Sequence, residues 1–118
     1  MGHGFKELDV WKMSMRLADA IFDVTEQFPP SQRYGLALQM QRCAVSVPSN
    51  IAEDSARAGR KEFVQFLYIV RGSLAELETQ LMLSYSRKYL LKESYQSLCA
   101  MIESINKMLG RLIQSQKS

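Results

Sequence analysis

The segment from residue 33 to residue 57 has a helical pattern with a proline inside it, and this combination constrains the fold most. Apolar residues recur at the three- and four-residue spacing of one helix face on both sides of Pro48. Proline lacks a backbone donor and crowds the carbonyl one turn earlier, so the helix either kinks or breaks there. Because Ile51 resumes the pattern at once, we predict a kinked helix that continues, in which Ser46, Ser49 and Asn50 can bond the freed carbonyls.

The same helical period recurs at about residues 9–28, 61–90 and 95–112, which predicts three further amphipathic helices. Two consecutive prolines end the first of them, and Ser31 is a candidate cap for the helix that contains Pro48. Gly59 is the expected end of that helix. Gly72 lies inside the third segment, where glycine costs up to about 1 kcal/mol, so we expect another backbone to approach it closely.

Four helices with short connections and no period-two alternation indicate an all-α fold. We predict an antiparallel up-down four-helix bundle with a proline-kinked second helix. Residues 1–7 are expected to be a flexible lead-in, residues 8–113 a single domain, and residues 114–118 a flexible tail.

Composition agrees with one globular domain that is not in a membrane. The 118 residues are 47% hydrophobic and 23% charged, which argues against disorder. The N-terminus has no apolar stretch of a signal peptide, and the apolar run at residues 63–70 is too short to span a bilayer. Cys43 and Cys99 form no disulfide framework, so we expect a reducing, cytoplasmic location.

Residues with catalytic potential are few and poorly placed. His3 is the only histidine and lies in the expected lead-in, which argues against histidine-based catalysis and against a di-iron bundle. Glu76 and Glu78 are two apart and point in different directions on a helix, so they cannot hold one metal together. Cys43 lacks an evident base. We therefore predict a protein that is not an enzyme and uses no cofactor or metal.

Five polar residues fall in segments that are expected to be packed. One interpretation is an interhelical hydrogen-bond network that sets the register of the second and third helices. Another is that they line a subunit interface or a central channel. Glu53 is also a candidate partner of Arg42 or Arg71 in a buried ion pair. The five residues are Ser46, Asn50, Glu53, Glu76 and Thr79.

Several motifs together resemble one known family. These are Tyr34-Gly35-Leu36, the run RCAVSVPSNIAE at residues 42–53, Lys61-Glu62-Phe63, and the run GSLAELETQL at residues 72–81. In this order they resemble the bacterial four-helix-bundle proteins encoded in intervening sequences of 23S ribosomal RNA genes. The resemblance covers roughly residues 8–112.

The resemblance implies a homopentamer without enzymatic activity. The family is similar to the accessory variability determinant of diversity-generating retroelements, a basic pentameric protein that binds nucleic acid and a reverse transcriptase. We therefore expect an oligomeric binding or scaffolding protein that associates with RNA or DNA. The alternative is a self-assembling scaffold for a protein such as a reverse transcriptase, without direct nucleic acid binding.

Charge is segregated along the chain. Residues 33–61 carry five basic and two acidic side chains and residues 87–118 carry six and two, whereas the other two segments are net acidic. In a fivefold assembly these charges form rings that attract a polyanion. The same charges are also explained as solvated faces or as docking surfaces between subunits. The candidate nucleic-acid-binding residues are Arg57, Arg60, Lys61, Arg87, Lys88, Lys92, Lys107 and Arg111.

Overall fold

The computed structural model describes residues 4–55 and 59–117, with side chains described at all of these positions except 54, 55, 60 and 117. The described residues form helices and no strand. In chain order the elements are η1 (Gly4–Glu7), α1 (Asp9–Thr25), η2 (Pro30–Gln32), α2 (Leu36–Ser55), α3 (Arg60–Ser86) and α4 (Lys92–Lys117).

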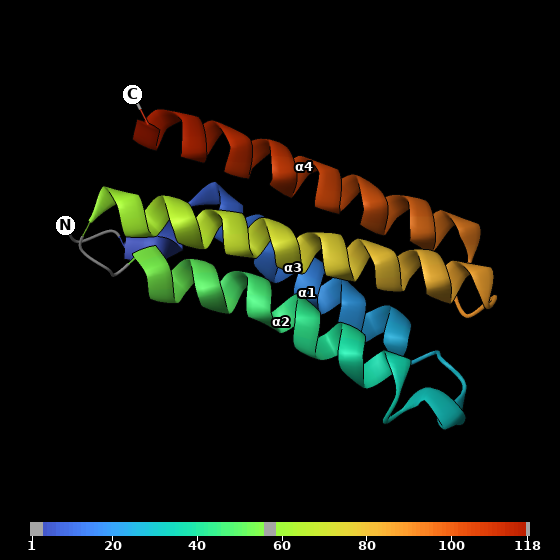
Figure 1. The fold of residues 1–118 in the computed structure, drawn as a ribbon. Coiled ribbons are helices and arrows are strands. Elements are labelled where there is room, and N and C mark those ends of the chain that lie inside the picture. Colours follow the sequence, from blue (N-terminus) through green and yellow to red (C-terminus); the bar gives the residue numbers. More distant parts are fainter. Residues whose placement is uncertain (1–3, 56–58, 118) are drawn as a thin grey trace.

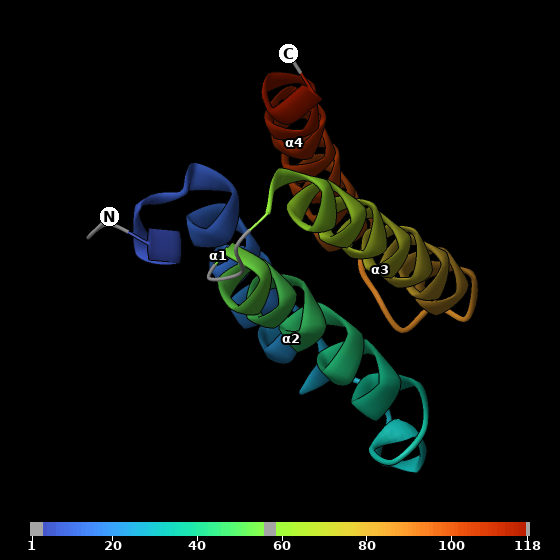
Figure 2. The ribbon, with the colours of Figure 1, turned by 60° about the vertical axis from the view of Figure 1, so that its left-hand side comes forward.

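The four α-helices pack as a closed ring of antiparallel neighbours. Each helix contacts the next one along the chain, and α4 returns to contact α1 (Figures 1 and 2). The bundle measures 45 × 21 × 20 Å, so its length is set by its helices. The predicted all-α, up-down four-helix bundle is confirmed.

One apolar stripe from each helix builds the core. Seven of its leucine and isoleucine side chains have a relative exposure of 0%. Full burial of such a side chain contributes about 1.5–3 kcal/mol, so the stripes account for most of the driving force. These seven are Leu17, Ile21, Leu74, Leu77, Leu81, Ile105 and Leu109.

Helix α2 continues through Pro48, as the resumed apolar pattern predicted. Val47 and Ile51 are buried on either side of the proline, so both halves of the helix contribute to one core. The Ser46 hydroxyl donates to the carbonyl of Cys43 at 2.6 Å, within the turn that precedes the proline. The carbonyl that Pro48 leaves without a backbone donor is that of Ala44, so this bond to Cys43 does not show the predicted role of Ser46.

The ends of the first two helices differ from the prediction. Helix α1 ends at Thr25, and Phe28 closes the following turn by donating its N–H to the Thr25 carbonyl at 3.1 Å. Helix α2 begins at Leu36 and not near Ser31. Its cap is the side-chain oxygen of Gln32, which accepts the Leu36 N–H at 3.3 Å, so glutamine performs the role that was assigned to serine.

The predicted lead-in and tail are more ordered than expected where they are described. Residues 4–7 form the short helix η1, and Phe5 packs edge-on against Trp11 with ring centroids 5.2 Å apart. Helix α4 continues to Lys117 because Ile113, in its last turns, is still buried. Residues 1–3 and 118 lie outside the described part of the chain.

The expectation for Gly72 is wrong within a single chain. A Cβ atom built at this position meets nothing within 4 Å. Gly110 on α4 is a glycine that another helix approaches closely, because a Cβ atom there lies 3.3 Å from a guanidinium nitrogen of Arg71 on α3. Glycine at position 110 therefore makes room for Arg71, whereas glycine at position 72 has no such role in the isolated bundle.

Helix α3 ends in a Schellman motif around a residue with positive φ. The Lys88 N–H bonds the Tyr85 carbonyl at 3.0 Å, and the Tyr89 N–H bonds the Ser84 carbonyl at 2.9 Å. Lys88 has a φ of 66°, a conformation that glycine adopts without strain and lysine does not. Tyr89 then packs against Phe28, with ring centroids 5.4 Å apart.

No helix in the part of the chain that the structure describes is long and apolar enough to cross a membrane.

Lys88→Gly should stabilise the protein by about 1 kcal/mol, because it relieves the left-handed backbone conformation at the end of α3. The matched control is Arg87→Gly, which removes the same charge from a residue with φ of −80°. We expect that variant to lose about 0.5–1 kcal/mol. Urea unfolding of both variants measures the difference. Equal effects would show that charge, and not backbone conformation, decides stability here.

Candidate functional site

Exposed basic side chains from two connections lie at one end of the bundle. Arg87, Lys88 and Lys92 surround the turn between α3 and α4, and all three side chains are exposed. Arg33 and Tyr34 lie in the turn that precedes α2, at the same end of the bundle (Figure 1). Tyr34 is 83% exposed. These five residues are called the turn-end cluster below.

The Phe28–Tyr89 contact joins the two connections that carry the turn-end cluster. Phe28 is buried, and Tyr89 directly follows the Schellman turn in which Lys88 lies. This ring contact therefore packs the connection after α1 against the connection after α3. Glu26 and Glu93 are exposed acidic residues in the same regions, so four basic side chains face two acidic ones there.

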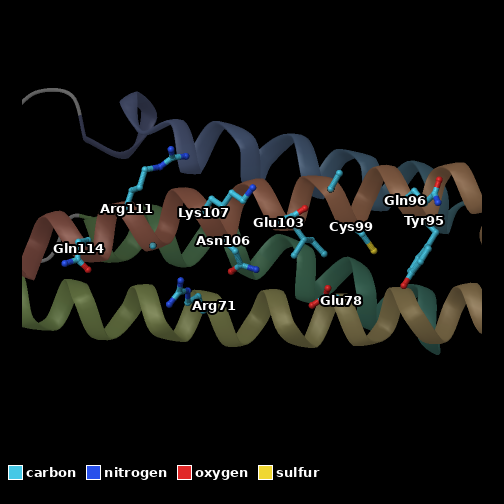
Figure 3. Close-up of a pocket in the computed structure, with 13 residues that line it drawn as sticks. Arg71, Glu78, Tyr95, Gln96, Cys99, Glu103, Asn106, Lys107, Arg111 and Gln114 are labelled. Carbon is cyan, nitrogen blue, oxygen red and sulfur yellow. The ribbon is translucent and has the colours of Figure 1, made fainter.

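A second basic group lies in a groove between α3 and α4. The groove has a volume of about 1100 Å³, and Arg71 points into it from α3 (Figure 3). Lys107 and Arg111 line it from α4, one helical turn apart. Asn106 and Gln114 add side-chain amides near Arg71. Sequence reasoning did not include Arg71 in this group, because only the antiparallel pairing of α3 with α4 brings it beside Gly110.

The other half of the groove is acidic and aromatic. Glu78 and Glu103 line it from opposite helices, and Figure 3 shows Glu78 on the α3 side of the gap. Tyr95 lies beyond them and stacks on Tyr85, with ring centroids 4.5 Å apart and planes 4° from parallel. Carboxylates in this position oppose a polyanion, so the groove is a poorer phosphate site than the turn-end cluster.

The predicted nucleic-acid-binding residues that the structure describes therefore lie in separate regions of the bundle. Arg87, Lys88 and Lys92 come together at one end, and Lys107 and Arg111 share the groove. Lys61 is exposed at the start of α3, about 39 Å from Arg87 at 1.5 Å per residue. Arg60 opens α3 but its side chain is not described, and Arg57 lies outside the described residues.

Among the described contacts, one of the five polar residues links α3 to α2: Glu76, whose carboxylate lies near the Cys43 thiol. Ser46 bonds Cys43 within α2, and Thr79 bonds the Ala75 carbonyl within α3 at 2.9 Å. Asn50 is half-buried, while Glu53 and Glu76 are exposed. The predicted buried ion pair is wrong, because Glu53 and both of its candidate partners, Arg42 and Arg71, are exposed.

Other polar groups join these two helices. The Cys43 thiol donates to the Ser73 carbonyl at 3.2 Å, and the Ser84 hydroxyl lies 3.2 Å from the sulfur of Met40. Gln80 is buried on α3, and its side-chain oxygen has no hydrogen-bond partner in the described chain. Spacing alone predicted that Cys43 and Ser84 face the core, but not which carbonyl or sulfur each would meet.

Cys43 is not suited to nucleophilic chemistry. Burial, together with the nearby carboxylate of Glu76, raises the pKa of its thiol to about 11. The reactive thiolate is therefore scarce at neutral pH. Burial also raises the pKa of Cys99. Among the described residues, no group of three or more His, Cys, Asp or Glu side chains could hold a metal ion.

The fold and these surfaces define a class of protein. It is a small antiparallel helical bundle with a basic cluster at one end and a groove on its outer surface. The model of the family described as 23S rRNA-intervening sequence protein matches residues 6–111. The chain belongs to this family.

A solved structure supports this assignment. It is the crystal structure of a protein with unknown function, from the S23 ribosomal protein family, of Bacteroides thetaiotaomicron. The two chains are 26% identical and align with a TM-score of 0.82 over 89% of this chain and 95% of the other. No curated protein matches the chain significantly.

Cys43 should react with iodoacetamide about tenfold or more slowly than Cys99 in the folded protein at pH 7.5. The reason is that Cys43 is more deeply buried and its raised pKa leaves about a hundredth of the thiolate of an ordinary cysteine. Mass spectrometry of the labelled peptides gives both rates. The control is the same reaction in denaturant, where the rates should converge. Equal rates in the folded protein would contradict this description of the Cys43 site.

Proposed function

We propose that this chain is a non-enzymatic, self-assembling binding protein that holds the phosphate backbone of RNA or DNA at the turn-end cluster. The observation that carries the proposal is the gathering of four exposed cations and one exposed tyrosine at one end of the bundle. Neither the matching family nor the similar solved structure is described with a catalytic activity.

Electrostatics and stacking both suit this role. Four cations against two carboxylates leave the region net positive, and a polyanion gains by releasing counterions on binding. Tyr34 offers an exposed ring on which a base can stack, an interaction worth about 1–3 kcal/mol and tolerant of sequence. We therefore expect binding with little base preference, because contacts to the phosphate backbone carry no sequence information directly.

Self-assembly would multiply this surface. The family resemblance implies a homopentamer, and cyclic symmetry repeats the same end of each bundle on one side of the ring. A ligand that spans several copies of the turn-end cluster then binds far more tightly than to one copy.

The second candidate is a scaffold for a protein partner without nucleic acid. Leu91 favours it, because this side chain is 76% exposed between Lys92 and the Schellman turn. An exposed leucine contributes to a protein contact and gains little from a phosphate backbone. By analogy with retroelement accessory proteins, a reverse transcriptase is the partner class for this alternative.

The triple variant Arg87→Ser, Lys88→Gly, Lys92→Ser should weaken binding to a mixed-sequence RNA and flatten its salt dependence. Each lost phosphate contact reduces the slope of log K against log salt by about 0.7 for a single strand. The matched control is Lys61→Ser, Lys107→Ser, Arg111→Ser, which removes the same charge elsewhere. Fluorescence anisotropy at several salt concentrations measures both.

Loss of binding in the first variant alone would support the turn-end cluster. An equal loss in both would mean that net charge alone is responsible. Wild-type protein that binds neither RNA nor DNA would favour the protein scaffold. Light scattering after size exclusion tests assembly separately, and a monomer at micromolar concentration would contradict the self-assembly part of the proposal.

A further inference from the structure

The groove between α3 and α4 is bordered by two rows of side chains, and the residues of each row are seven positions apart. Seven residues make about two helical turns, so successive members of a row lie about 10 Å apart along the bundle. The α3 row consists of Arg71, Glu78 and Tyr85, and the α4 row, in the opposite direction, of Gly110, Glu103 and Gln96. The two rows therefore divide the groove into three levels.

Two contacts fix how the rows face each other. A guanidinium nitrogen of Arg71 lies 3.3 Å from the place where a Cβ atom of Gly110 would be. At the other end of the groove, Tyr85 of α3 stacks on Tyr95 of α4. Because α3 and α4 are antiparallel, a step forward along α3 corresponds to an equal step back along α4. The middle level therefore sets the α3 carboxylate of the groove opposite the α4 carboxylate.

These two carboxylates, Glu78 and Glu103, have no cation between them. Both side chains are exposed, and neither forms an ion pair with another residue that the structure describes. Figure 3 shows both residues at the same level of the groove. Two carboxylates on opposite sides of one groove repel each other, and a cation between them removes that repulsion. The middle level is therefore a place for a basic group supplied from outside the chain.

The level of Arg71 has the opposite charge. The Arg71 side chain is exposed and points into the groove, and within the described chain it also has no ion-pair partner. Gly110 leaves room for its guanidinium beside the backbone of α4. Lys107 adds a second cation to the lining, and a guanidinium can bind a carboxylate through two parallel hydrogen bonds. This level is therefore a place for an anionic group, about 10 Å from the basic one.

The alternation of charge along the groove decides what kind of molecule fits it. A nucleic acid carries only negative charges, so the two carboxylates repel it. A docked helix needs an apolar seam, but Ile102, the largest aliphatic side chain of the lining, is only 1% exposed. An extended peptide needs partners for its backbone groups, and the side-chain amides of Gln96 and Asn106 can donate and accept hydrogen bonds. Three residues of extended chain span about 10 Å, which is the spacing of the two charged levels.

We propose that the α3–α4 groove binds an extended segment of another protein in which a basic side chain and a carboxylate are about three residues apart. The basic side chain lies between Glu78 and Glu103, and the carboxylate bonds the Arg71 guanidinium. This site is separate from the turn-end cluster and requires neither nucleic acid binding nor self-assembly. It goes beyond the proposed function because it assigns a second ligand, a peptide of mixed charge, to a different surface.

The test uses a phage-displayed library of random peptides, selected in parallel on the wild type and on Arg71→Glu. Peptides enriched on the wild type should contain a basic and an acidic residue about two to four positions apart. Fluorescence anisotropy of the synthetic peptides then measures their affinity. Arg71→Glu should weaken binding about tenfold or more, because a charge-assisted contact becomes a repulsion. Changing the acidic residue of the peptide to lysine should restore its binding to Arg71→Glu.

Two further variants test the other level and the specificity of the effect. Glu78→Gln with Glu103→Gln should weaken the peptides selected on the wild type about tenfold, because the basic side chain loses both carboxylates. The matched control is Arg87→Glu, which makes the same charge change outside the groove and should bind these peptides like the wild type. All of the substituted side chains are exposed, so the circular dichroism spectrum should not change.

Three peptide results would overturn the inference: no peptide that prefers the wild type to Arg71→Glu, enriched peptides with charges of one sign only, or no restoration by the lysine peptide. An RNA that Arg87→Glu binds but Arg71→Glu does not would overturn it by placing nucleic acid in the groove. A lower mass of Arg71→Glu in light scattering would overturn it by showing that a second copy covers the groove.

The two proposals can fail separately. The test of the turn-end cluster changes Arg87, Lys88 and Lys92, which do not line the groove. Loss of RNA binding in that variant, with peptide binding unchanged, would leave both proposals standing. A wild type that binds selected peptides but neither RNA nor DNA would remove only the proposed function.

Discussion

The contact between α1 and α4 closes the ring of helices, and the core depends on that closure. Each helix has one apolar stripe, and most helical stability in proteins comes from the packing of such a face. Val10 on α1 and Ile113 on α4 are buried close to one end of this contact, so α4 remains helical almost to the end of the chain. The interior is then filled by side chains, and the groove that holds the polar residues of α3 and α4 lies on the outside.

The periodic apolar residues were sufficient to predict four helices, their order and the continuation of α2 through Pro48. They were less informative at helix ends, where one side chain decides the boundary. Gln32 caps α2 although serine is the usual cap, and Ile113 prolongs α4 into a segment that reads as polar. The apolar pattern also did not predict which polar groups form hydrogen bonds with one another. Periodicity placed Cys43 near the core, but it does not specify that its partner is a carbonyl of α3.

The sequence shows that basic residues are concentrated in two segments, but it does not show where those residues lie in the folded bundle. Helix α3 separates the two basic segments, so Lys61 at its start and Arg87 just after its end lie at opposite ends of the bundle. The group that results combines residues from two connections held together by Phe28 and Tyr89. Gly72 shows the reverse case. The sequence suggested a close approach, but no atom of the described residues lies within 4 Å of a Cβ atom built at this position.

An even number of antiparallel helices returns the chain to the end from which it started. Figure 1 places the first described residues and the last turn of α4 at the same end, opposite the two connections that carry the turn-end cluster. The bundle therefore has a polarity, with a surface formed by turns at one pole and the chain ends at the other. Any protein segment fused to either end of the described chain would extend from the second pole, so such additions leave the surface at the first pole accessible.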